Sequence, residues 1–239
     1  MRMRAAIVAP VLVVSALAHA DSASTDSHGD LRQAAGAGEG SDPEPESTEP
    51  RPGCLEALDE LGVDYERARR RGIRLGVQVN GALQGIEFRA YKAGVPLVLD
   101  CSLVYSLARS GELLARHGIE VVRYSSAYDR RNIRGTRRPS RHSFGLAIDV
   151  HTFRTADGEV YTIKDDYEQG LGDNLDCIGE ALTEAGQHLR AIDCLLTRSE
   201  LYRVVLSPDF DADHYNHFHL EALPWDERTD PIRPTPSER

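Results

Sequence analysis

A break in composition near residue 52 confines folding to the middle of this 239-residue chain. Residues 21–52 are rich in Ser, Gly, Pro, Asp and Glu, with eight acidic residues against Arg32 and Arg51. Such a segment cannot bury enough apolar surface to offset the entropy lost on ordering. We therefore predict a disordered acidic linker at 21–52, a folded domain at 53–226 and a flexible, proline-containing tail at 227–239.

The first 20 residues predict an export signal. Arg2 and Arg4 precede the apolar run Ala5 to Leu17, and Ala18-His19-Ala20 is a small-x-small sequence that signal peptidase can cut. The run is shorter than the roughly 20 residues that span a bilayer. We expect a periplasmic or secreted protein with no integral membrane segment once the signal is removed. The alternative is a buried N-terminal helix.

The charge balance bears on possible partners. The chain has 28 Lys+Arg against 38 Asp+Glu, a net charge of -10, and no stripe rich in Lys and Arg. Neutralising phosphates requires clustered basic residues, so nucleic acid is not an expected partner. We expect the domain to be monomeric.

Four cysteines, all in the folded part, predict disulfides, because an exported protein meets an oxidising compartment. Three pairings are possible. We favour Cys54–Cys101 and Cys177–Cys194, since each pair joins neighbouring helical segments. Free buried thiols are the alternative. No pair has CxxC spacing, so a four-cysteine zinc site is not indicated.

The alternation of helical and extended patterns favours a single α+β domain, with a small antiparallel sheet flanked by helices. Helical patterns cover residues 54–71, 174–189 and a segment capped by Asp100 and stopped by Gly118. A capping box at 197–200 predicts one more helix start. Strands are expected within 73–93, at 121–125 and at 216–221, with a hairpin around Asp157-Gly158.

Two short segments hold the residues that suggest chemistry, Ser140 to Asp149 and Asp213 to Leu220. In the second, His217 and His219 are two apart, so on a strand both imidazoles leave the same face. In the first, His142 and Asp149 are seven apart, and Gly145 offers the bend that lets them converge. Two imidazoles and one carboxylate, with water in the fourth position, are typical of catalytic zinc.

Such a site would generate a nucleophile at neutral pH, because zinc lowers the pKa of its water to about 7 in favourable sites. A third histidine beside the metal can act as a base or hold the oxyanion. The alternative is that each residue is an ordinary structural one. His117, His151 and His188 lack such partners in the sequence and are predicted to be surface or core residues.

The segment Ser140 to Asp149 resembles the SxHxxGxAxD signature of the LAS metallopeptidases. That superfamily includes D-alanyl-D-alanine peptidases, lysostaphin-type endopeptidases and the hedgehog zinc-binding fold. Asn216-His217-Phe218-His219 resembles their HxH motif. Across Gly53 to Glu221, the arrangement is most similar to the extensin-like C-terminal family of bacterial exported proteins.

The resemblance implies a LAS/hedgehog-type fold and a role for each site residue. It implies that His142, Asp149 and His219 bind Zn²⁺ and that His217 is catalytic, with His214 as an alternative base. Some relatives place an acidic residue where this chain has Asn216, and this difference favours His217.

The resemblance also implies that Arg131 and Ser140 bind substrate. An arginine before the first motif binds a substrate carboxylate in relatives, which suits a planar guanidinium. The family usually has a cysteine before that arginine, and this chain has Arg130, so Arg130 and Arg131 both stay candidates. The alternative is a solvated loop with five arginines.

These expectations together predict an exported zinc hydrolase of the D-Ala-D-Ala carboxypeptidase or endopeptidase type. Its partner would be a peptidoglycan peptide or another cell-wall polymer. The first alternative is a non-catalytic wall-binding module that retains a structural zinc. A second is a hydrolase of some other peptide or ester.

Overall fold

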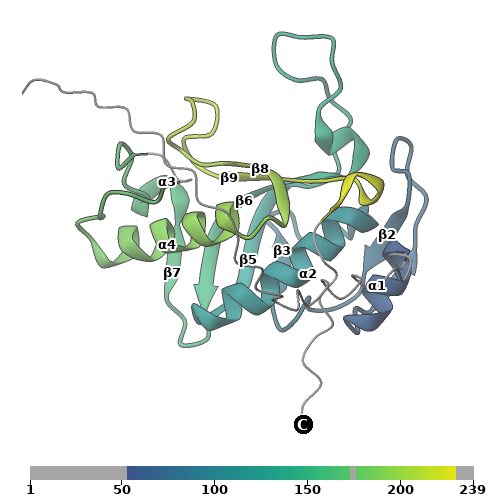
Figure 1. Cartoon of the computed structure of the whole chain (residues 1–239), viewed down its shortest axis with the longest axis horizontal. Helices are drawn as coiled ribbons and strands as arrows, with labels where there is room; N and C mark the ends of the chain where they lie inside the picture. The colour runs from purple at the N-terminus through teal and green to yellow at the C-terminus, as the bar shows by residue number, and fades with distance from the viewer. Residues whose placement is uncertain (1–52, 173–175, 230–239) are drawn as a thin grey trace, which may run out of the picture. The chain divides into compact units, whose positions relative to one another are not determined.

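The computed structural model describes residues 53–172 and 176–229, which form a mixed α+β domain (Figure 1). The predicted signal peptide at 1–20, the linker at 21–52 and residues 230–239 of the predicted tail lie outside this part of the chain. No helix within the described ranges is both long and apolar enough to cross a bilayer.

The domain contains two sheets. The larger has the strand order β3-β5-β6-β9-β8, with β7 paired to β6, and the smaller has the order β1-β2-β4. Every pair is antiparallel except β3 with β5, which run parallel, so the predicted antiparallel sheet holds with this one exception. The strands are β1 (Tyr65–Arg67), β2 (Gly76–Val79), β3 (Glu87–Ala90), β4 (Leu97–Asp100), β5 (Ile119–Ser126), β6 (Ala147–Thr155), β7 (Val160–Thr162), β8 (Tyr202–Leu206) and β9 (Phe218–Ala222).

Two long helices, α2 and α4, lie across one face of the larger sheet (Figure 1). Phe153 on β6 and Phe218 on β9 belong to the buried core, with their ring centroids 6.0 Å apart. On β5, Arg123 and Ser125 are exposed on either side of buried Tyr124, so the opposite face is open to polar side chains. The helical segments are α1 (Cys54–Glu60), α2 (Cys101–Arg116), α3 (Ile163–Asp166) and α4 (Glu184–Arg198), with 3₁₀ turns η1 (Arg141–Phe144) and η2 (Trp225–Glu227).

The cap predicted for α2 is confirmed, because the Asp100 side chain accepts a hydrogen bond from the Ser102 backbone N–H at 3.0 Å. The helix predicted at 54–71 is wrong in length, since α1 ends at Glu60. There Gly62 adopts a φ of 66°, and the N–H groups of Gly62 and Val63 bond back to the last turn. This is a Schellman ending, which stops the helix before the apolar pattern stops.

The helix predicted at 174–189 is displaced along the chain, since α4 begins at Glu184. Thr183 caps it by accepting a hydrogen bond from the Gly186 N–H at 3.0 Å. The predicted capping box at 197–200 is also wrong, because it lies at the end of α4 and leads into strand β8.

Packing continues beyond Asp226. The Trp225 N–H donates a hydrogen bond to Ser102 Oγ at 3.0 Å, and the Trp225 ring meets Tyr105 edge-on. Arg228 is buried and donates from Nη1 to Ser106 Oγ at 2.9 Å. The segment after β9 is thus attached to α2.

Both predicted disulfides are present in the structure. Cys54–Cys101 joins the first residues of α1 and α2, and Cys177–Cys194 joins the loop before α4 to that helix. The bonds close loops with sequence separations of 47 and 17. The first therefore constrains the unfolded chain more strongly than the second.

Replacing Cys54 and Cys101 together by Ala should lower the free energy of unfolding by about 4 kcal/mol, against about 3 kcal/mol for the Cys177 and Cys194 pair. Urea unfolding at one pH, followed by circular dichroism, measures both losses. A loss below about 1 kcal/mol for the first pair would contradict a stabilising role for that disulfide.

Candidate metal centre

His142 is presented by the 3₁₀ turn η1 and is fully buried. Ser140 caps the turn, since its side chain accepts a hydrogen bond from the His142 N–H at 3.4 Å. Gly145 ends the turn with a φ of 66° and provides the predicted bend. A Cβ at this position would lie 2.8 Å from both the Asp100 nitrogen and the Ile73 side chain. Only glycine satisfies both the conformation and the space.

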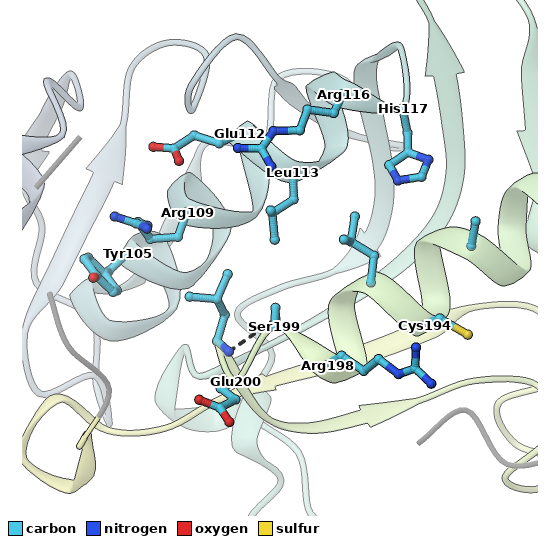
Figure 2. A pocket seen from close by; sticks show the side chains of 13 residues that line it. Tyr105, Arg109, Glu112, Leu113, Arg116, His117, Cys194, Arg198, Ser199 and Glu200 are labelled. Atoms are coloured by element: carbon cyan, nitrogen blue, oxygen red, sulfur yellow. Dashed lines mark hydrogen bonds between the residues drawn. The ribbon is translucent and has the colours of Figure 1, made fainter. Parts of the chain in front are cut away.

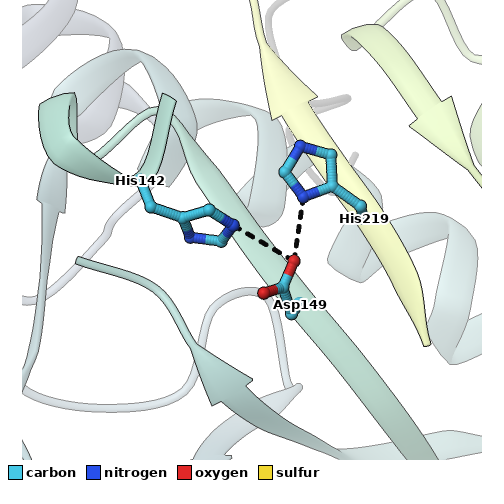
Figure 3. Close-up of side chains that lie close together, drawn as sticks. All are labelled: His142, Asp149 and His219. Atoms are coloured by element: carbon cyan, nitrogen blue, oxygen red, sulfur yellow. Dashed lines mark hydrogen bonds and ion pairs between the residues drawn. The ribbon is translucent and has the colours of Figure 1, made fainter. Parts of the chain in front are cut away.

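Asp149 and His219 lie opposite one another in the register of β6 and β9. His219 Nδ1 is 2.8 Å from Asp149 Oδ1, and His142 Nε2 is 3.1 Å from the same oxygen (Figure 3). One ligand atom from each of the three residues lies within 4.8 Å of the others. The structure therefore brings together the three predicted ligands, and the group could hold a metal ion.

The outer contacts of both imidazoles fit a bound cation. His142 Nδ1 is 2.9 Å from the Ala127 carbonyl oxygen, which can only accept a hydrogen bond, so this nitrogen carries the proton. In the neutral ring, Nε2 then presents its lone pair to Asp149. A lone pair facing a carboxylate oxygen requires a proton or a metal ion between them.

His219 has a longer outer contact, an ion pair. Its Nε2 lies 3.9 Å from Glu221 Oε2, and Glu221 in turn accepts a hydrogen bond from Arg141 Nε at 2.6 Å. Carboxylate or carbonyl acceptors on the outer nitrogen orient metal-binding histidines and set their tautomer. The residues present thus fit a metal ion in both the inner and the outer layer of contacts.

The electrostatics of the centre favour a positive charge between the donor atoms. Burial alone would raise the pKa of Asp149, but the His142 and His219 rings, when protonated, stabilise the carboxylate more strongly and hold the pKa well below its usual range. Burial would lower the pKa of His219, yet the hydrogen bond to Asp149 and the negative charges of Asp149 and Glu221 raise it to about 9. A metal ion would supply this charge in place of a proton.

His217 stands beside the group and precedes the first residue of β9. Its Nε2 is 3.5 Å from Asp149 Oδ1, and its Nδ1 is 2.9 Å from Asn216 Oδ1. Burial lowers the pKa of His217 to about 4, more than the charge of Asp149 raises it. The ring is therefore neutral at neutral pH.

His151 also borders the centre, which sequence reasoning missed. Its ring centroid lies 5.2 Å from that of His217 and 5.6 Å from that of Tyr91, and its Nε2 is 2.7 Å from Ser125 Oγ. Register shifts between β5 and β6 occur at this point. Bulges of this kind are common next to active sites, where they change the direction of a side chain. The sequence signal that could have revealed His151 is its position two residues after Asp149.

His214 reaches the centre from the loop before β9. Its ring centroid is 5.1 Å from that of His217 and 5.8 Å from that of His219. Its Nδ1 lies 2.6 Å from Asp211 Oδ1, so this nitrogen is engaged away from Asp149.

Of the two arginine candidates, Arg131 lies at the centre. Its Nη2 is 3.3 Å from Asp149 Oδ2, and its Nε is 3.4 Å from Asp129 Oδ2. Arg130 and Arg131 both line a hollow of about 320 Å³. Ser140 is buried beneath η1 as its cap. Substrate binding by Arg131 and Ser140 stays a prediction.

A separate hollow of about 690 Å³ lies between α2 and α4 (Figure 2). Arg109, Glu112 and Arg116 reach it from α2, and Arg198 from α4. None of the predicted site residues lines it. Within residues 53–172 and 176–229, His142, Asp149 and His219 form the one triad of possible ligands with this spacing.

Replacing Gly145 by Ala should reduce both stability and metal content, because a non-glycine residue in the left-handed region costs about 1–2 kcal/mol and the added methyl group also clashes. Gly118→Ala is the matched control, since Gly118 has a φ of 72° with open space around it. Thermal unfolding and elemental analysis measure both effects. Equal metal content in the two variants would contradict a positioning role for Gly145.

Comparison with known proteins identifies the family. Neither the curated proteins nor the solved structures contain a match to this chain. The family described as extensin-like protein C-terminus matches residues 53–229, which spans all of the described elements. The chain therefore belongs to the extensin-like C-terminus family.

Proposed function

We propose that this protein is an exported, zinc-dependent hydrolase that cleaves amide bonds in peptidoglycan peptides, of the D-Ala-D-Ala carboxypeptidase or endopeptidase type. The observation that carries the proposal is the meeting of two imidazoles on one carboxylate, with the imidazole of His217 at 3.5 Å from that carboxylate. The two histidine-containing motifs also resemble those of the LAS metallopeptidases. A relationship to that superfamily and a LAS/hedgehog-type fold are part of the proposal.

Zinc is proposed from the donor set. Two imidazole nitrogens and one carboxylate oxygen leave the fourth tetrahedral position open, as in catalytic zinc sites. When bound, the metal would supply Lewis acidity, which polarises a substrate carbonyl and lowers the pKa of water.

His217 is suited to act as the general base. The Asn216 side-chain oxygen is 2.9 Å from His217 Nδ1 and can only accept, so that nitrogen carries the proton. The lone pair is then on Nε2, the atom nearer Asp149. A neutral imidazole held in this tautomer can take a proton from an attacking water and return it to the leaving amine.

Basic residues around the centre support a substrate with free carboxylates. Arg70 and Lys92 line a hollow of about 410 Å³ that shares Ser126 and Ala127 with the surroundings of His142. Arg131 contacts Asp149 directly, at 3.3 Å. Its guanidinium has five donors, so it can contact Asp149 and still receive a carboxylate of the substrate.

Export is proposed from the N-terminal sequence and the two disulfides. Arg2, Arg4 and the apolar run after them are typical of a signal peptide. Disulfides persist in oxidising compartments such as the bacterial periplasm. Both features agree with access to cell-wall peptide.

His217→Ala should lower the hydrolysis rate by roughly 10²–10⁴-fold while the metal content stays unchanged, because removing a general base costs about that much. The assay is chromatography of products released from purified sacculi, with elemental analysis of the same samples. His117→Ala, at the end of α2, is the control and should keep both rate and metal.

Two results would count against the proposal. Wild-type rate in His217→Ala would remove His217 from the chemistry. Metal-loaded wild-type protein that binds sacculi and releases no product would favour the alternative of a wall-binding module with a structural metal.

A further inference from the structure

A basic groove lies on the open face of the larger sheet, next to the metal centre. It has a volume of about 600 Å³ and is lined by residues of β3, β5, β6 and β7. Three of its lining residues are arginines, Arg89, Arg123 and Arg154, and no acidic side chain is among the lining residues. In a chain with a net charge of -10, this concentration of positive charge favours an anionic occupant.

A row of aromatic rings connects the groove to the centre. The His217 ring lies beside His151, and His151 lies beside Tyr91, with centroid separations of 5.2 and 5.6 Å. Tyr91 also lines the groove, and its hydroxyl is 2.7 Å from Thr152 Oγ1 on β6. A molecule bound at the metal centre can therefore extend along Tyr91 into the groove.

Arg123 differs from the other two arginines in its partners. Arg89 is paired with Glu87, and Arg154 is paired with Glu120 at 3.1 Å. Arg123 has no carboxylate partner among the described residues. Its guanidinium lies over the Tyr91 ring, 4.4 Å from the centroid.

The contact with Tyr91 prepares Arg123 to bind a carboxylate. The ring face attracts the guanidinium and holds it in the groove. The N–H donors of a guanidinium lie in one plane and match a carboxylate in bidentate geometry. The structure thus holds a cation over Tyr91 in the groove.

The register of β5 and β6 gives the distance to the centre. Ser126 pairs with Asp149, and Arg123 lies three residues away along β5. At about 3.3 Å per residue, Arg123 is roughly 10 Å along the strand from the metal centre. That length corresponds to about three residues of an extended peptide.

We propose that Arg123, held over the Tyr91 ring, binds a second carboxylate of an anionic peptide substrate, located two to three residues from the scissile bond. This inference rests on the proposed function and defines its substrate class more narrowly. Arg131, which contacts Asp149, would then bind a different carboxylate, next to the scissile bond.

The test uses two probes that differ in one group. The first is the stem peptide L-Ala-γ-D-Glu-L-Lys-D-Ala-D-Ala, which keeps a free carboxylate on its glutamyl residue, and the second is the same peptide with that group as an amide. Binding is measured by calorimetry on zinc-loaded His217→Ala protein, so that the probes are not cleaved during the measurement. The same background is combined with Arg123→Gln, or with Arg203→Gln as control, since Arg203 is an exposed arginine on β8.

We expect the free carboxylate to improve affinity by about tenfold or more, as for a charge-assisted hydrogen bond. Arg123→Gln should abolish this preference, and Arg203→Gln should retain it. The proposal is overturned if the parent protein binds both probes equally or binds neither. It is also overturned if Arg123→Gln keeps the preference.

Cleavage of the same two probes by the wild-type protein separates this inference from the proposed function. Equal cleavage of both, without a carboxylate preference in binding, would overturn the groove assignment and leave the hydrolase intact. A carboxylate preference that depends on Arg123, without any cleavage, would support the groove and contradict the hydrolase.

Discussion

The pairing of β6 with β9 is the constraint on which the centre depends. Asp149 faces His219 in this register, although the two residues are 70 positions apart in the chain. Phe218 and Leu220, the neighbours of His219 on β9, are buried in the core. A slip of one residue would turn His219 into the core and expose these apolar side chains, so core burial fixes the register that builds the site.

The third member of the centre is held by a different kind of structure. His142 comes from a 3₁₀ turn, and the turn owes its shape to the cap at Ser140 and the left-handed conformation of Gly145. Its outer nitrogen is fixed by the Ala127 carbonyl, while Glu221 faces that of His219. The hydrogen bond on His142 and the ion pair on His219 favour inner nitrogens directed at Asp149, which lowers the reorganisation needed when a metal binds.

Local chemistry made part of this structure predictable. The Asp100 cap, the bend at Gly145 and the two-residue spacing of His217 and His219 follow from short-range rules. The cysteine pairing is predicted from the helical segments that each pair joins. The same short-range rules failed where a backbone turn ended a helix before the apolar pattern of the sequence ended. At Gly62 the Schellman turn stopped α1, although apolar residues continued with helical spacing.

The features that sequence could not show arise from contacts between distant strands. His151 has no partner near it in the sequence, and only the irregular pairing of β5 and β6 places it against Ser125, with its ring beside His217. Likewise, Arg89, Arg123 and Arg154 are scattered along the chain and form one basic groove because β3, β5 and β6 are neighbours. Absence of a basic stripe in the sequence therefore did not mean absence of a basic surface.

The metal centre can be tested by an anomalous difference map, collected at the zinc edge, from crystals of protein purified without a histidine tag. We expect a single strong peak between His142 Nε2, Asp149 and His219 Nδ1, about 2.0–2.1 Å from each imidazole nitrogen, and no peak in His142→Ala crystals. Zinc bound elsewhere in the domain, or a fully ordered triad without any peak in zinc-supplemented crystals, would contradict this expectation.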